Sequence, residues 1–137
     1  MKLNALQAGF NLDHIVLESP NPDDLAEFYK EIIMMEFVKK NNSEIICEGK
    51  NRKIILRKGK KNKLSYAGFS CRSKKNLDQF KNFIISNNVK LSEFENNHFK
   101  KGSFSIIDPD KNILSFGTRK ESKDHYKNEL CMPLQHL

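Results

Sequence analysis

Apolar residues recur along this chain in two copies with the same spacing. Leu25, Phe28 and Ile32 stand at the spacing of one helix face. The same pattern returns 52 positions later, where Leu25 falls on Leu77 and Phe28 falls on Phe80. A chain with an internal repeat is expected to build its fold from similar supersecondary units.

Each copy predicts one helix that follows a strand and precedes three more strands. The first helix begins near Pro22, because proline suits the first turn of a helix, and Ser73 caps the second helix. Short β-rich runs separated by turn residues predict the strands. These strands are 12–18, 36–39, 44–48 and 52–57 in the first repeat, and 64–71, 89–94, 102–107 and 112–118 in the second.

The two β-α-β-β-β repeats, 12–57 and 64–118, predict a single α+β domain over residues 10–118. Because each repeat has only one helix, we expect the two sheets to pair into a curved, half-open mixed β-barrel with the helices outside. The concave face of such a barrel is the expected ligand position. The predicted core consists of Leu12, Leu17, Leu25, Phe28, Ile32, Ile54, Leu64, Phe69, Leu77, Phe80, Ile84, Phe104, Ile106, Leu114 and Phe116.

Two short motifs resemble a known family. The run Leu12-Asp13-His14-Ile15-Val16-Leu17 opens the first repeat, and Asp108-Pro109-Asp110-Lys111-Asn112 joins the last two strands. With these motifs, residues 10–118 resemble the vicinal oxygen chelate superfamily of glyoxalases, bleomycin-resistance proteins and extradiol dioxygenases. The chain departs from the family pattern after the first helix, where Met34 follows Ile33 instead of a glycine following leucine.

The resemblance implies where a metal would be held in a dioxygenase. Two histidines and a glutamate would stand at the positions that His14, Tyr66 and Ser115 occupy here. Only His14 matches, since serine is a weak neutral ligand and tyrosine would have to lose a proton of pKa near ~10. We therefore expect these three residues to line a pocket and predict no complete metal site in this chain.

Residues 119–137 are interpreted as a linker followed by the start of a missing second domain. The last four residues, Leu134 to Leu137, repeat the pattern of Leu12 to Ile15, so His136 becomes the candidate first ligand of that following domain. On this interpretation, Fe(II) or another divalent metal belongs to a full-length protein and no cofactor to this chain. The alternative is a frayed tail with an incidental histidine.

The net charge of +7 changes this picture little. Basic residues cluster between Lys50 and Lys63, but no aromatic residue alternates with them, so we predict no nucleic-acid partner. No apolar run approaches the length of a membrane span, and we predict no membrane partner. The odd count of three cysteines, without a C-x-x-C pair, favours a reducing cytoplasm.

Three functions remain open after the sequence alone. The first is the metal-free structural N-terminal part of an extradiol ring-cleavage dioxygenase-like protein. The second is a free-standing, bleomycin-resistance-type protein that binds a small organic molecule, and the third is a small metal-dependent lyase or isomerase. The expected protein partner is a second copy in a homodimer, or the missing C-terminal domain.

Overall fold

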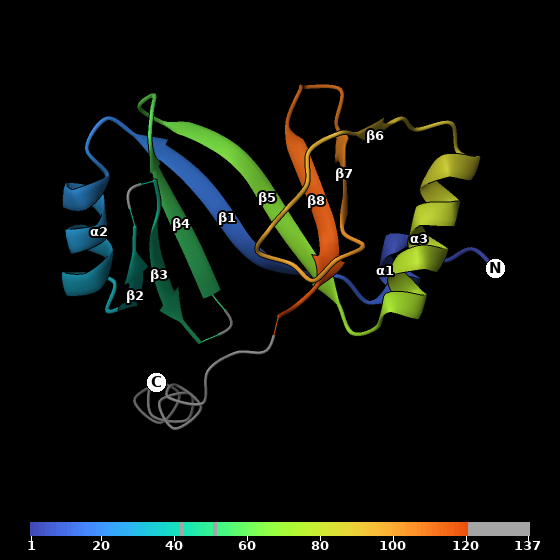
Figure 1. Cartoon of the computed structure of the whole chain (residues 1–137), viewed down its shortest axis with the longest axis horizontal. Helices are drawn as coiled ribbons and strands as arrows, with labels where there is room; N and C mark the ends of the chain where they lie inside the picture. The colour runs from blue at the N-terminus through green and yellow to red at the C-terminus, as the bar shows by residue number, and fades with distance from the viewer. Residues whose placement is uncertain (42, 51, 121–137) are drawn as a thin grey trace. The chain divides into compact units, whose positions relative to one another are not determined.

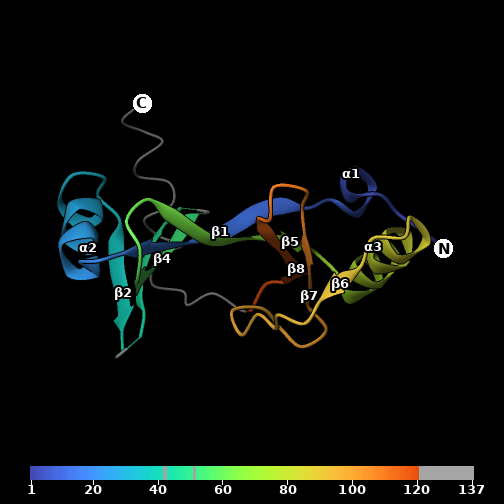
Figure 2. The same cartoon turned by 90° about the horizontal axis from the view of Figure 1, so that it is seen from above.

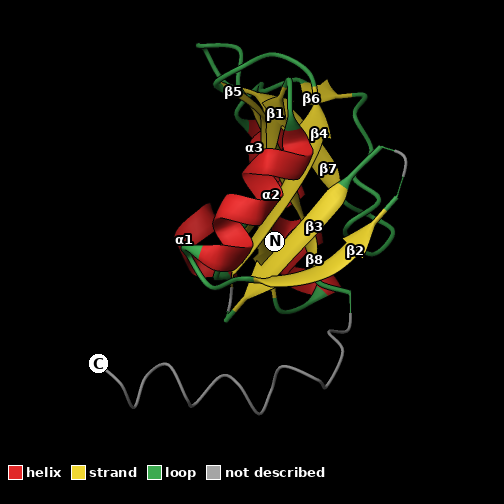
Figure 3. Ribbon diagram, turned by 90° about the vertical axis from the view of Figure 1, so that its left-hand side faces the viewer, coloured by secondary structure: helices red, strands yellow, loops and turns green. Residues whose placement is uncertain are grey.

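The computed structural model describes residues 1–41, 43–50 and 52–120 of the chain. Helices and strands follow one another in these residues largely as the repeat predicts (Figures 1 and 3). The elements are α1 (Ala5–Ala8), β1 (Asn11–Ser19), α2 (Pro22–Glu31), β2 (Glu36–Lys40), β3 (Ile45–Gly49), β4 (Arg52–Lys58), β5 (Lys63–Cys71), α3 (Lys74–Ser86), β6 (Leu91–Ser92), β7 (Phe104–Ile107) and β8 (Ile113–Thr118).

The strands of the described residues form a mixed sheet of eight strands that is not closed. Their hydrogen-bonding order is β2-β3-β4-β1-β5-β8-β7-β6. Strands β5 and β8 pair in parallel, whereas the pairs β2–β3, β3–β4, β6–β7 and β7–β8 are antiparallel. The predicted fold class, α+β with two β-α-β-β-β repeats in an open mixed sheet, is confirmed.

The described chain divides into two compact units. Unit 1 consists of Met1–Leu17 and Leu64–Lys120, and unit 2 includes Glu18–Lys63. The division cuts through β1, so most of the first strand belongs with the elements of the second repeat. His14 therefore lies in the same unit as Tyr66 and Ser115, although more than 50 residues separate it from either in the sequence.

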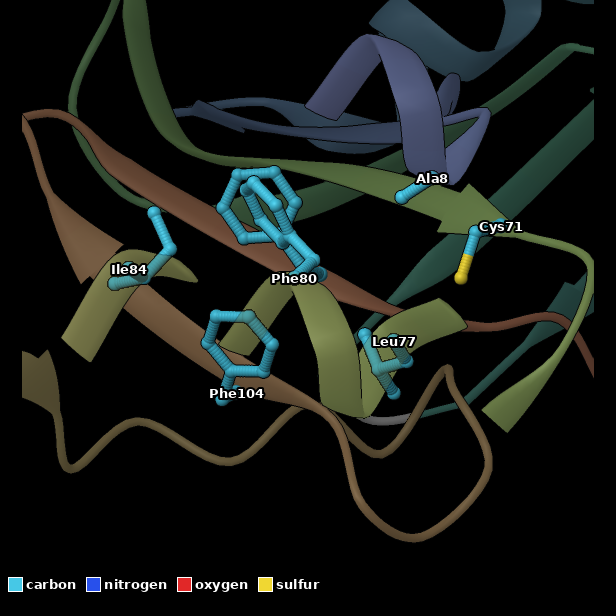
Figure 4. Close-up of a cluster of buried hydrophobic side chains, with 7 residues drawn as sticks. Ala8, Cys71, Leu77, Phe80, Ile84 and Phe104 are labelled. Carbon is cyan, nitrogen blue, oxygen red and sulfur yellow. The ribbon is translucent and has the colours of Figure 1, made fainter. Parts of the chain in front are cut away.

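The core of unit 1 forms where α3 packs on β7 and β8. The side chain of Ser73 caps α3 by accepting from the backbone N–H of Asn76, as predicted. Leu77, Phe80 and Ile84 are buried on one face of this helix (Figure 4). The ring of Phe80 contacts two strand aromatics, with centroid distances of 5.9 Å to Phe104 and 4.9 Å to Phe116. The predicted core positions in α3, β7 and β8 are thus largely confirmed.

The segment between β6 and β7 departs from the prediction. A strand over residues 89–94 was expected, but β6 contains only Leu91 and Ser92, and residues 93–103 form a long connection that contains no strand (Figures 1 and 2). This connection passes beside β8, since Phe99 forms an isolated bridge with Arg119. The chain leaves the sheet early because Asn96 and Phe99 are buried against other parts of unit 1.

Unit 2 packs the short helix α2 against its antiparallel strands. The core of this unit contains Ala26, Met35, Ile45, Cys47, Ile55 and Leu56. The helix ends without glycine, and Met34 takes the left-handed conformation with φ of 64°. A residue with a Cβ pays about 1–2 kcal/mol for this conformation.

The predicted apolar stripe of α2 is partly wrong. Phe28 and Ile32 are 48% and 65% exposed, whereas Ala26 is buried and Leu25 and Tyr29 are half-buried. Because Ala26 is small, this side of the helix can approach the strands closely, and the larger Phe28 and Ile32 are left outside. The matching residues of α3, Phe80 and Ile84, are buried. The two helices therefore have the same spacing of apolar residues, but this apolar face is buried only in α3.

Leu12 and Leu64 are a second correction to the predicted core. Both are exposed, because each stands near the beginning of its strand, ahead of the residues that are covered. In β1, burial begins at Asp13 and His14, which means that polar side chains occupy an interior that was expected to be apolar. No helix in the described part of the chain is long and apolar enough to cross a membrane.

Candidate functional site

The three predicted pocket residues lie on one face of unit 1. In the parallel pair β5–β8, Phe69 is opposite Phe116 and Gly68 is opposite Ser115. Phe116 packs in the core with α3, and because side chains alternate along a strand, Ser115 points the other way. We call this other face the inner face; it carries His14 from β1, Tyr66 and Gly68 from β5, and Ser115 from β8.

Gly68 makes room for His14 on the inner face. A Cβ at this position would lie 2.5 Å from Cε1 and 2.6 Å from Nε2 of the imidazole. His14, Tyr66 and Ser115 are all at most 2% exposed. The imidazole and the Tyr66 ring meet edge to face with their centroids 5.5 Å apart. The sequence therefore identified residues that come together, but they form a buried cluster and line no open surface.

A fourth residue, Asn96, connects the three. Its Nδ2 lies 3.2 Å from Nε2 of His14 and donates to Oγ of Ser115 at 3.0 Å. Its Oδ1 accepts from the Tyr66 hydroxyl at 3.0 Å and from the backbone N–H of His98 at 2.9 Å. The Asn96 carboxamide is itself buried and satisfies the polar groups of all three predicted positions.

Asn96 reaches this position because residues 93–103 are held against β8. The backbone N–H of Lys100 donates to the carbonyl of Thr118 at 3.0 Å. The ring of Phe99 lies over Gly117, where a Cβ would be only 2.4 Å from the ring. The same ring is 5.0 Å from the imidazole of His14, centroid to centroid. This strand-less connection therefore closes over the inner face and seals the polar cluster.

The hydrogen bonds determine the proton positions in the cluster. A backbone N–H can only donate, so the Asn96 atom that faces His98 must be the oxygen, and the atom that faces His14 must be the amide nitrogen. Nε2 of His14 must then be the unprotonated acceptor. The ring proton is on Nδ1, which lies 2.7 Å from Oδ2 of Asp13. In this arrangement Nδ1 of His14 faces Asp13 and Nε2 accepts from Asn96.

Asp13 links the cluster to the surface. Its second oxygen, Oδ1, accepts from Nε of Arg119 at 2.8 Å, and the Arg119 side chain is half-exposed. Burial alone would raise the pKa of this carboxyl, but the hydrogen bonds from His14 and Arg119 outweigh burial and lower the pKa to about 2. Asp13 is therefore ionised throughout the ordinary pH range and orients the His14 ring.

This pKa predicts an acid-sensitive step in the stability of the chain. Because the folded pKa of about 2 lies below the ordinary value of 3.8, the carboxylate stabilises the fold above pH 4 and loses this contribution as the pH falls towards 2. The difference corresponds to about 2 kcal/mol in the free energy of unfolding. Urea unfolding between pH 2 and 6 should show this loss, and the Asp13→Asn variant should show a flatter dependence. Equal slopes in both proteins would contradict the role of Asp13.

The described residues do not fit a metal ion at this position. Nε2 of His14 already accepts from an amide, Tyr66 donates its hydroxyl proton, and Ser115 is a neutral acceptor. No group of three His, Cys, Asp or Glu side chains in residues 1–41, 43–50 and 52–120 could hold a metal. Cys47 and Cys71 are buried, and burial raises the pKa of both thiols. His136, the candidate ligand of a following domain, lies outside the described residues.

Several residues of the cluster were not found from the sequence. Asp13 stands beside His14, and an acidic residue next to a histidine could have been noticed as its orienting partner. Asn96 gave no signal, because it is one asparagine in the polar run 95–98 of an asparagine-rich chain. Arg119 and Phe99 likewise gave none. His98 is half-buried, with its ring centroid 5.6 Å from that of His14.

No protein-family model and no curated protein matches the chain. Solved structures do. A catechol 2,3-dioxygenase matches with a TM-score of 0.67 and 18% identity over 79% of this chain. Homoprotocatechuate 2,3-dioxygenase from Arthrobacter globiformis matches with a TM-score of 0.69 and 12% identity over 87% of this chain.

This chain has the vicinal-oxygen-chelate fold. At these levels of identity, the likeness establishes the fold. The chain spans 38% of the catechol 2,3-dioxygenase chain and 39% of the Arthrobacter enzyme. Hypothetical protein BH1468 from Bacillus halodurans C-125 has the fold in a chain of similar length, with a TM-score of 0.60 and 14% identity; the match covers 85% of this chain and 99% of that one. The vicinal-oxygen-chelate resemblance of the motifs around His14 and Asp108–Asn112 is thus confirmed as a likeness of fold.

Proposed function

We propose that this chain provides the metal-free structural domain of an extradiol-dioxygenase-like protein. The observation that carries the proposal is the position of Asn96. Its carboxamide is hydrogen-bonded to His14, Tyr66 and Ser115. These three residues occupy the positions where the resemblance implies metal ligands. A hydrogen-bonded side chain in this place stabilises the domain and leaves no ligand position open.

The comparison with solved structures supports a role as one part of a larger protein. The dioxygenases that the chain resembles are more than twice as long as the part that it matches. In a full-length protein of this kind, Fe(II) or another divalent metal would be bound by a following domain, with His136 as its first ligand. That following domain would then be the protein partner of this chain.

A metal titration of the full chain tests the proposal. The metals are Fe(II) under anaerobic conditions, Mn(II) and Zn(II), each at a concentration 100-fold above a micromolar Kd. None of them should change the Tm of the wild-type protein. A folded-state site of that affinity would stabilise the protein by about 2.7 kcal/mol. One bound equivalent with such a shift, both lost in the His14→Ala variant, would contradict the proposal.

A free-standing protein that binds a small organic molecule is the second candidate. The match to BH1468 favours it, because that chain carries the fold at nearly the same length. In this case the purified chain should be a homodimer by light scattering, as expected for a cavity that two copies form together. A monomeric mass over the micromolar range would count against this candidate and leave the structural domain as the better account.

A further inference from the structure

The polar groups of the inner face are complementary to one chemical group. His14 and Ser115 each present an acceptor, Nε2 and Oγ, to the same nitrogen, 3.2 Å and 3.0 Å away. Tyr66 and the backbone N–H of His98 each present a donor to the same oxygen, at 3.0 Å and 2.9 Å. A planar group that fits must therefore carry an NH2 and a carbonyl oxygen on one carbon atom.

We infer that the inner face of unit 1 is a binding site for a primary carboxamide, which Asn96 supplies from within the chain. The inference rests on the proposed function in one respect, that Asn96 takes the place of an external ligand. A carboxylate is excluded because it has no N–H to donate to Nε2 of His14 and Oγ of Ser115. A tertiary amide is excluded because it has no N–H for His14 and Ser115.

The tautomer of His14 gives the site its selectivity. Nδ1 of His14 lies 2.7 Å from Oδ2 of Asp13, which is itself bound by Arg119, so Asp13 holds a proton on Nδ1 and Nε2 is the ring nitrogen that faces Asn96. An imidazole free to exchange tautomers would accept or donate at Nε2 and would tolerate a carbonyl as well as an amide there. Asp13 and Arg119 therefore act as positioning residues for carboxamide recognition.

The site has the size of the asparagine side chain. Replacing Asn96 by glycine removes the atoms of acetamide and leaves a cavity with the same donors and acceptors, because His14, Tyr66, Ser115 and Phe99 beside it are buried. The rings of Phe99 and Tyr66 lie close to His14 and exclude water from its surroundings. A ligand with so few atoms is expected to bind the variant with a Kd of about 1 mM.

Rescue of the Asn96→Gly variant by acetamide tests the inference. At 100 mM acetamide the folded state of the variant should be favoured about 100-fold, and most of the lost Tm should return. Sodium acetate and N,N-dimethylacetamide at the same concentration should give no rescue. Wild-type protein, with its site filled, and Asn97→Gly, which changes the exposed neighbour, should not respond to acetamide.

A second variant, Asn96→Ala, tests the inference if Asn96→Gly does not fold. In the Asn96→Ala variant the Cβ is retained, and formamide then supplies the missing carboxamide. Rescue by N,N-dimethylacetamide equal to that by acetamide, or no rescue of either variant, would overturn the inference. The metal titration of the wild-type protein is independent of this result, so failure of the carboxamide site and failure of the proposed function can be told apart.

Discussion

Replacing Asn96 by leucine should destabilise the chain by about 4 kcal/mol or more. Leucine has nearly the same shape, so the packing is retained while four hydrogen bonds disappear. The buried acceptors of His14 and Ser115 would lose their donor, the Tyr66 hydroxyl and the half-buried N–H of His98 would lose this acceptor, and a buried polar group without its partner costs about 1–3 kcal/mol. Urea unfolding followed by circular dichroism measures the loss.

Asn97→Leu is the matched control for this variant. Asn97 is the next residue in the same connection, and its side chain is exposed, so the expected change is within about 0.5 kcal/mol. If both variants lose the same stability, the segment 93–103 is simply intolerant of leucine. A loss below about 1 kcal/mol for Asn96→Leu would show that the cluster does not hold the connection in place.

Gly68→Ala should cost about 3 kcal/mol, the upper part of the range for overpacking. The new methyl group would lie 2.5 Å from the His14 ring, which has no free space because Phe99, Tyr66 and Asn96 surround it. To make room, the imidazole would have to move away from Asp13 and Asn96 and break its hydrogen bonds. The destabilisation therefore starts from a steric clash, and the loss of the His14 hydrogen bonds follows from it.

Gly49→Ala separates this effect from the general cost of changing a strand glycine. Gly49 ends β3, and the nearest atom to its added Cβ is Cγ of Met35 at 4.0 Å, an ordinary contact. This control should change the free energy of unfolding by less than about 1 kcal/mol. Comparable losses in the two alanine variants would contradict the tight packing of His14 on Gly68.

Local features of the fold could be predicted because they depend on neighbours in the sequence. Ser73 caps α3 as expected, and the turn after β7 is closed by Asp108, whose Oδ1 accepts from the backbone N–H of Asn112 at 2.8 Å. The register of the repeat was sufficient to predict α2, α3 and most strands, but not α1, which precedes the first repeat. It was insufficient for the orientation of α2, because periodicity places Phe28 on an apolar stripe but does not decide which side of a short helix is covered.

The candidate site, like the fold, could be predicted only in part. From the sequence by itself, His14 and Tyr66 were predicted at equivalent places in the first strands of the two repeats and Ser115 in the last strand, and the resemblance grouped the three. Only the tertiary structure decided that Asn96 lies between them, 82 positions from His14 and 19 from Ser115. Residues 93–103 have no periodic pattern that would indicate their path, and a carboxamide can bond to water as well as to a protein group. Its partners are therefore fixed only when β1, β5 and β8 bring donors and acceptors together and Phe99 packs on Gly117.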